Sequence, residues 1–159
     1  MNTHVDDILW ASEPAVDDIM NAILKELIPG TIEETNFKYC GVEIAQLEDF
    51  SIRVTCKAAI AKLDPISISQ GRAKQQDDPC TKEEQSELWS VTGSLMWIAR
   101  SFWPRIAYGV VALQSVVQKP LVRDLILANK IVRVVKDEPN DGLIYRPVIA
   151  WPAPSAQHV

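Results

Sequence analysis

Residues 81–104 decide the fold of this chain, and they have the sequence TKEEQSELWSVTGSLMWIARSFWP. Thr81 and Glu84 have the spacing of a reciprocal capping box, which predicts a helix N-terminus. Pro104 predicts the end of that helix, because proline lacks a backbone donor and clashes with the preceding turn. The apolar positions between them recur at helical spacing and predict one buried stripe, made of Leu88, Val91, Leu95, Ala99 and Phe102.

Two further helices are predicted after this one. Each begins at a proline, Pro104 or Pro120, and proline is favoured in the first turn of a helix. Three consecutive helices predict a small bundle over residues 81–136. The apolar stripes are Ile106, Val110, Leu113 and Val117 in the first of the two, and Leu121, Leu125, Ala128, Val132 and Val135 in the second.

Strand patterns are prominent before the bundle. Residues 3–10 hold two short β-favouring runs separated by Asp6 and Asp7, which predicts a tight hairpin with carboxylates at its tip. Period-two alternation over 37–44 and over 50–56 predicts a second hairpin. Between them, an amphipathic helix is predicted from Ser12 to a stop at Gly30. The predicted fold class is therefore α+β.

The charge is divided unevenly along the chain. The 159 residues are 47% apolar and carry a net charge of -5, which suits one globular domain with a core of its own. Residues 1–50 contain 2 Lys or Arg against 11 Asp or Glu, whereas residues 51–159 contain 14 against 10. The first part can attract cations and the second part can attract polyanions.

Cysteine and histidine usage limits the metal chemistry. Three cysteines and two histidines, at no recognised spacing, exclude a zinc-type ligand set. The odd number of widely spaced cysteines favours reduced thiols and an intracellular protein, cytoplasmic or nuclear. No apolar run approaches a membrane span and no export signal is recognisable, so we expect a soluble protein without a membrane partner.

Six segments resemble, in order and spacing, the reverse transcriptases of copia-type retrotransposons, part of the Pol polyprotein. The resemblance covers about residues 3–147. The segments are HVDDILWAS (4–12), FKYCGVEI (37–44), GSLMWIAR (93–100), WPRIAY (103–108), ANKIV (128–132) and GLIY (142–145).

The resemblance implies a fragment of an RNA-directed DNA polymerase. Residues 1–68 would form the C-terminal part of the polymerase palm, 69–80 a linker, 81–136 a helical thumb, and 137–159 a connection strand with a loose tail. The intact enzyme would bind an RNA or DNA primer–template and a deoxynucleoside triphosphate, and would transfer the nucleotide with two metal ions. An uncovered edge of the palm sheet would favour self-association.

The aspartate pair is the candidate catalytic and metal site. By resemblance, Asp6 and Asp7 would be the polymerase aspartates that bind Mg²⁺ or Mn²⁺, and carboxylate oxygens are the ligands that Mg²⁺ prefers. Taken alone, a Val-Asp-Asp triplet is more often a solvated turn. The family also takes a metal-binding aspartate from an earlier strand, which this sequence does not contain, so we expect the chain alone to be inactive.

The second hairpin would lie where the family grips the primer strand. The implied residues are Cys40, Gly41, Val42 and Glu43. Gly41 within a strand would permit close approach of another backbone, and a bulge or packing glycine is the alternative.

The sequence also departs from the family pattern. His4 stands where an aromatic residue is usual, and Arg105 replaces an aspartate after Pro104. No aspartate after residue 149 marks the start of a ribonuclease H domain, so we expect no such activity.

A basic face is predicted on the third bundle helix. Lys119, Arg123, Lys130 and Arg133 fall within an arc of about 80°, opposite the apolar stripe. Such a face would follow a phosphate backbone without reading sequence, and an ordinary solvated face is the alternative. The competing function is a non-catalytic remnant, a helical module that binds nucleic acid or a protein. Trp89, Trp97 and Trp103 are expected in the packing of the bundle.

Overall fold

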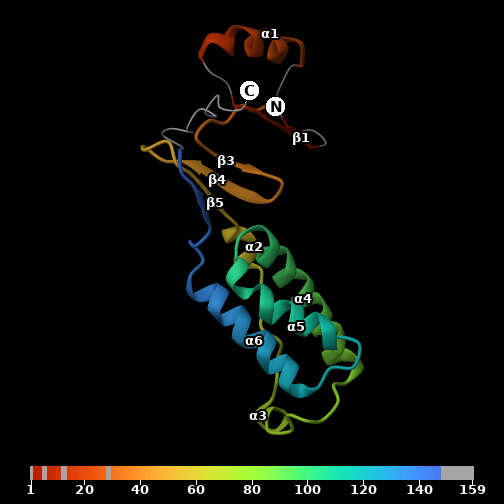
Figure 1. Cartoon of the computed structure of the whole chain (residues 1–159). Helices are drawn as coiled ribbons and strands as arrows, with labels where there is room; N and C mark the ends of the chain where they lie inside the picture. Colours follow the sequence, from red (N-terminus) through yellow and green to blue (C-terminus); the bar gives the residue numbers. More distant parts are fainter. Residues whose placement is uncertain (1, 5–6, 12–13, 28–29, 148–159) are drawn as a thin grey trace, which may run out of the picture.

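The computed structural model describes residues 2–4, 7–11, 14–27 and 30–147, and these form a mixed α+β fold (Figure 1). An acidic first part with two sheets precedes a helical bundle. The strands are β1 (Asn2–His4), β2 (Asp7–Leu9), β3 (Asn36–Tyr39), β4 (Val42–Gln46), β5 (Ile52–Thr55) and β6 (Leu143–Tyr145). The helices are α1 (Asp17–Leu27), α2 (Lys57–Ala61), α3 (Gln70–Ala73), α4 (Lys82–Ser101), α5 (Ala107–Val116) and α6 (Val122–Asp137), with 3₁₀ turns at Pro14–Val16 and Pro104–Ile106.

The first hairpin and the amphipathic helix are present as predicted. β1 and β2 pair antiparallel, with His4 opposite Asp7. α1 follows with Asp17 and Asp18 in its first turn, where the helix dipole favours anions. No residue of α1 is buried. The predicted cap Ser12 lies outside the described residues.

The second predicted hairpin is present, since β4 and β5 pair antiparallel around a turn at residues 48–49, but its first predicted strand is in fact two strands. Residues 37–44 form two strands, β3 and β4, joined at Cys40 and Gly41, and β5 adds a third strand. Cys40 has φ 51° and Gly41 has φ 82°, the positive values that a two-residue hairpin loop requires at both positions. Gly41 is therefore a turn glycine, and a Cβ at this position would meet no atom within 4 Å.

The sheet is completed from the far end of the sequence. β6, predicted as a strand, pairs antiparallel with β5 and gives the order β3-β4-β5-β6. A Cβ at Gly142 would lie 2.2 Å from the backbone oxygen of Val54, so the connection into β6 passes too close to β5 for a side chain. Close backbone approach thus occurs at Gly142 instead of Gly41.

The segment between the sheet and α4 packs onto the helices. Ile60, Leu63 and Ile66 are buried in one core cluster with the bundle residues. The expected linker over 69–80 contains α3, and it is held in place by Arg72. The guanidinium of Arg72 pairs with both carboxylate oxygens of Glu84 at 2.9 Å and donates to the Pro79 carbonyl at 2.8 Å.

The three-helix bundle is confirmed. The Thr81–Glu84 capping box is present in both directions. The predicted stripes supply most of the core, and the largest side chains without solvent exposure include Leu88, Leu95, Leu113 and Leu125. The bundle thus forms as its apolar spacing dictates.

The connection between α4 and α5 is joined to the turn after α6 near Trp103. Its indole lies in the core and donates to the Asp141 carbonyl at 3.3 Å. The Arg105 guanidinium stacks 4.0 Å from the Trp103 ring centroid, and it pairs with Glu138 at 2.6 Å and with Asp141 at 3.4 Å. The arginine that departs from the family pattern therefore ties the start of α5 to the turn after α6.

Burial is distributed unequally along the chain. Among the described residues, the buried apolar side chains begin at Cys56, and before it only Ser51 and Thr55 are buried. Figure 1 shows α1 at one end of an elongated molecule, the four-stranded sheet in the middle and the bundle at the other end. None of the helices in the described ranges is long and apolar enough to cross a bilayer.

Candidate nucleic-acid interface

The aspartate pair lies at the first hairpin. Asp6 lies outside the described residues. Asp7 is the first residue of β2, and only the backbone of Asp7 is described. Within the described ranges, no group of three or more His, Cys, Asp or Glu side chains is placed to hold a metal ion. The magnesium site therefore stays a prediction from the resemblance.

Glu43, one of the residues matched to the primer grip, holds a helix in place. Its carboxylate accepts hydrogen bonds from the backbone N–H groups of Lys57 at 2.9 Å and Ala58 at 3.1 Å. These are among the first N–H groups of α2, which have no partner within the helix. Glu43 thus joins the sheet to the bundle as a cap supplied from 14 residues away.

The other three residues of that set differ in exposure. Cys40 is exposed in the turn, next to Gly41. Val42 is half-buried and packs against the core cluster. Cys40 and Gly41 are thus the pair at the tip of the β3–β4 hairpin that is open to a ligand.

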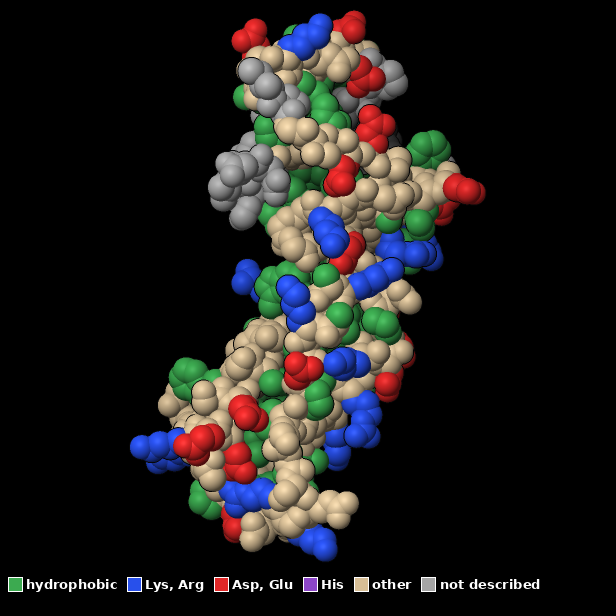
Figure 2. All heavy atoms as spheres, turned by 180° about the vertical axis from the view of Figure 1, so that it is seen from behind, with side chains coloured by type: hydrophobic (Ala, Val, Ile, Leu, Met, Phe, Trp, Pro, Cys, Tyr) green, Lys and Arg blue, Asp and Glu red, His purple; other side chains and the backbone are tan. Residues whose placement is uncertain are grey.

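Three of the four predicted cations lie on one exposed face of α6. Arg123, Lys130 and Arg133 are all exposed. Lys119 is exposed as well, but it precedes α6, which begins at Val122, so its assignment to the helix is wrong. Proline at 120 starts the turn that leads into the helix, and the helical spacing therefore does not extend back to residue 119. Figure 2 shows Lys and Arg side chains along the part of the bundle that α6 forms.

The cations differ in their contacts. The Arg123 guanidinium pairs with Asp77 at 3.1 Å, but both side chains are largely exposed, 59% and 87%, so the pair contributes little to stability. Within the described residues, neither Lys130 nor Arg133 forms an ion pair. These two charges are therefore available to an anionic ligand.

Polar contacts fix α6 in position. The Asn129 side-chain amide bonds to both backbone groups of Ile66. The Lys136 ammonium donates to the Leu63 carbonyl. The Asp124 carboxylate accepts from the backbone N–H of Leu121 at 2.8 Å and caps the helix. The basic face is therefore carried on a rigid element.

The tryptophans divide into one buried residue and two partly exposed ones. Trp103 is 2% exposed and belongs to the core, as expected. Trp89 is 51% exposed and donates its indole N–H to the Val117 carbonyl at 3.1 Å. Trp97 is 39% exposed and packs edge-on against Phe102, with ring centroids 5.2 Å apart.

Sequence reasoning missed a hollow beside Trp97. It has a volume of about 440 Å³ and lies between α2 and α4. A mid-helix glycine, Gly93, next to a surface tryptophan was the available signal, because a missing side chain opens space on a helix face. The lining residues are Ala59, Lys62, Leu63, Gly93, Ser94, Trp97 and Ile98.

Two of the three thiols, those of Cys56 and Cys80, are not poised for chemistry. Burial raises the pKa of Cys56 to about 11, with a smaller effect from the nearby Glu43 charge. Burial also raises the pKa of Cys80 to about 11. A thiol is reactive as the thiolate, so both cysteines fit the structural role that the sequence suggests.

Comparison of the chain with protein-family models, curated proteins and solved structures gave no match.

Proposed function

We propose that this chain is a fragment of a copia-type reverse transcriptase, comprising the C-terminal part of the palm and the thumb. In the intact enzyme it would take part in two-metal nucleotidyl transfer from a deoxynucleoside triphosphate to a primer end. The support is the six segments quoted above, together with the order of the elements. A hairpin that carries Asp7 comes first, three strands of a small sheet follow, a three-helix bundle comes next, and β6 closes the sheet.

The observation that carries the binding part of this proposal is the exposed basic face of α6. Lys130 and Arg133 have no carboxylate partner within the described residues. Arg123 pairs only with Asp77, whose side chain is exposed. Cations on one side of a rigid helix suit the regularly spaced phosphates of a duplex. Such contacts position a nucleic acid without reading its sequence.

The test is the salt dependence of duplex binding, measured by fluorescence anisotropy of a labelled primer–template between about 50 and 200 mM salt. Each phosphate neutralised contributes about -0.9 to the log–log slope on B-DNA. The double variant Arg123→Glu/Lys130→Glu should flatten that slope and weaken all sequences alike. Lys74→Glu/Lys82→Glu makes the same change of net charge at exposed sites outside α6, and its slope should equal that of the unaltered chain.

Catalysis by the chain alone is not expected, because two adjacent aspartates leave a metal pair short of ligands. Primer extension on a poly(rA) template with Mg²⁺ or Mn²⁺ should give no product. Incorporation that Asp6→Asn abolishes would show that the missing aspartate is dispensable.

The second candidate function is a protein-binding module. It is favoured by α1, which exposes an apolar face and buries none of its residues. An unchanged salt slope in Arg123→Glu/Lys130→Glu would favour this function over nucleic-acid binding.

A further inference from the structure

The hollow beside Trp97 has small side chains along its floor. Ala59, Gly93 and Ser94 belong to its lining, and a Cβ at Gly93 would meet no atom within 4 Å. The space over this part of α4 is therefore open to a group from outside the chain. With a volume of about 440 Å³, the hollow has room for a flat ring such as a nucleobase.

Trp97 forms the aromatic wall of this hollow. Its side chain is 39% exposed, and its ring lies edge-on to Phe102, with the two ring centroids 5.2 Å apart. Phe102 is buried, so a core residue holds the indole in place. An exposed indole in a fixed position is a suitable stacking partner, because little side-chain freedom is lost when a ligand binds.

The charge at the hollow is positive. Among the described residues that line it, Lys62 is the one that carries a charge, and the neighbouring Asp64 is not part of the lining. Arg100 lies one helical turn beyond Trp97 on the same side of α4. Lys62 and Arg100 are exposed, and within residues 30–147 neither forms an ion pair. These cations favour a ligand that carries negative charge beside a flat ring.

The hollow adjoins the helix that carries the basic face. Leu63 belongs to the lining, and its carbonyl accepts a hydrogen bond from the Lys136 ammonium of α6. Arg133 lies one turn earlier on the same helix. Figure 2 shows Lys and Arg side chains both along α6 and where the sheet meets the bundle. A strand that follows the cations of α6 thus meets further cations on its way to Trp97.

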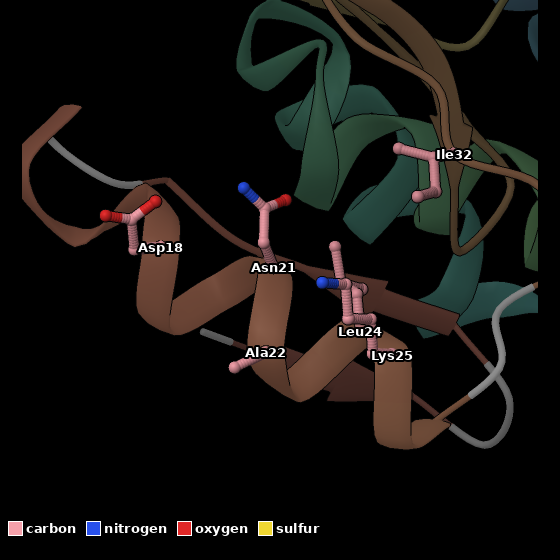
Figure 3. Close-up of a pocket in the computed structure, with 6 residues that line it drawn as sticks. All are labelled: Asp18, Asn21, Ala22, Leu24, Lys25 and Ile32. Atoms are coloured by element: carbon pink, nitrogen blue, oxygen red, sulfur yellow. The ribbon is translucent and has the colours of Figure 1, made fainter.

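The hollow beside α1 lacks these features. It is larger, about 600 Å³, and its lining consists of α1 residues together with Ile32 (Figure 3). In the figure, Asn21 and Leu24 point from the helix toward the side on which Ile32 lies. The described lining contains no aromatic ring, and its two charged residues, Asp18 and Lys25, have opposite signs. This hollow therefore favours neither a stacked ring nor an anion.

We propose that the hollow beside Trp97 receives an unpaired base of a nucleic acid whose duplex part lies on α6. The base stacks on Trp97, while Lys62 and Arg100 contact the phosphates next to it. Only an unpaired base can enter, because the bases of a duplex are stacked on one another. Aromatic stacking combined with cations along the backbone is a general way to bind single strands without reading their sequence. This subsite rests on the proposed function of α6 and extends it to single strands.

Two variants of the hollow and one control test the subsite. Trp97→Ala removes the stacking ring, and Gly93→Leu fills the open space while Trp97 and every cation stay in place. Gly93 is exposed within α4, and leucine is the better helix former, so Gly93→Leu should fold even if Trp97→Ala does not. Trp89→Ala, the control, removes an exposed tryptophan of the same helix that is not among the lining residues. Circular dichroism verifies the fold of each variant.

Fluorescence anisotropy gives the readout. The labelled probes are a blunt duplex and the same duplex with about four unpaired nucleotides at a 5′ or at a 3′ end. A further probe has abasic sites in the extension, which keep the phosphates and remove the bases. The unaltered chain and Trp89→Ala should bind one extended duplex about five-fold or more tighter than the blunt one, as the stacking of a single base predicts. The abasic extension should lose most of this gain.

Trp97→Ala and Gly93→Leu should bind the blunt duplex as the unaltered chain does and should lose the gain from the extension. Equal binding of blunt and extended duplexes by the unaltered chain would overturn the subsite and leave the proposed function standing. A gain that persists in both variants would also overturn it, and the hollow would then suit a protein side chain instead.

The failure of the proposed function has a different signature, because the blunt duplex then does not bind at all. In that case a free single strand of about eight nucleotides should still bind the unaltered chain and fail to bind Gly93→Leu. A free strand that binds both proteins equally, or neither, would overturn the subsite.

Discussion

Asn129 pairs through its side-chain amide with both backbone groups of Ile66. Its Oδ1 accepts from the Ile66 N–H at 2.7 Å, and its Nδ2 donates to the Ile66 carbonyl at 2.8 Å. A single side chain thereby satisfies the donor and the acceptor of an extended segment 63 residues away in sequence. The contact holds the segment that follows α2 against α6.

Asn129→Ala should therefore destabilise the protein. It leaves two partly buried backbone groups without partners, which costs about 1–3 kcal/mol. Asn140→Ala, at an exposed position in the turn after α6, should change the stability by less than about 0.5 kcal/mol. Urea unfolding followed by circular dichroism measures both. Equal midpoints for the two variants would show that the amide pairing contributes nothing.

Two Gly→Ala substitutions should have opposite effects. At Gly142, the added Cβ would lie 2.2 Å from the Val54 backbone oxygen, so the backbone must shift, and we expect a loss of about 1–3 kcal/mol. At Gly93, within α4, a Cβ meets nothing within 4 Å, and Ala should stabilise the helix by about 0.5–1 kcal/mol. Thermal unfolding of both variants is the measurement. A Gly142→Ala variant as stable as the unaltered chain would contradict the close contact between Gly142 and Val54.

Acid unfolding should depend on Glu84. The hydrogen bond from Arg72 is the main cause that lowers the Glu84 pKa below its ordinary value of 4.5. A lowered carboxyl pKa gives stability that is present above the unfolded pKa and is lost as the pH falls through the folded one. Between about pH 5 and 3, Glu84→Gln should therefore lose less stability than the unaltered chain. Glu87→Gln, which removes the same charge at an exposed site on the same helix, is the matched control.

The three thiols should react at different rates. Cys40 is exposed in its turn, whereas Cys56 is fully buried with a pKa raised to about 11. At pH 8, Ellman's reagent should modify Cys40 rapidly and Cys56 only on unfolding, with Cys80 slower than Cys40. Cys40→Ser should remove the fast phase and nothing else. A fast phase that persists in this variant would mean that the Cys80 thiol is accessible.

Sequence reasoning succeeded where the determinants are local. The capping box at Thr81 and Glu84 and the stripe that includes Leu88 and Leu95 depend on neighbours within one helix, and both are present. The turn at Cys40 and Gly41 was missed because alternation continues through it and cysteine is not the residue expected at a positive φ. Gly41 was the one local signal of a turn at this place in the sequence.

The candidate site was predictable only in part, for a similar reason. Helical spacing placed Arg123, Lys130 and Arg133 on one face, since periodicity within a helix is a local property. The pairing of Arg123 with Asp77 and the capping of α2 by Glu43 join residues 46 and 14 positions apart. Such contacts depend on tertiary structure, which no motif in the chain encodes.

The pairing of β6 with β5 has a consequence for the order of folding. Ile52 lies opposite Tyr145, so the two strands enclose nearly the whole helical part of the chain in one loop. The entropic cost of closing that loop falls sharply once α4, α5 and α6 have packed and brought its ends together. The helices, rich in local contacts, should therefore form first. The last strand joins the sheet only afterwards, so a nascent chain on the ribosome holds β5 as an open edge until its bundle has been synthesised.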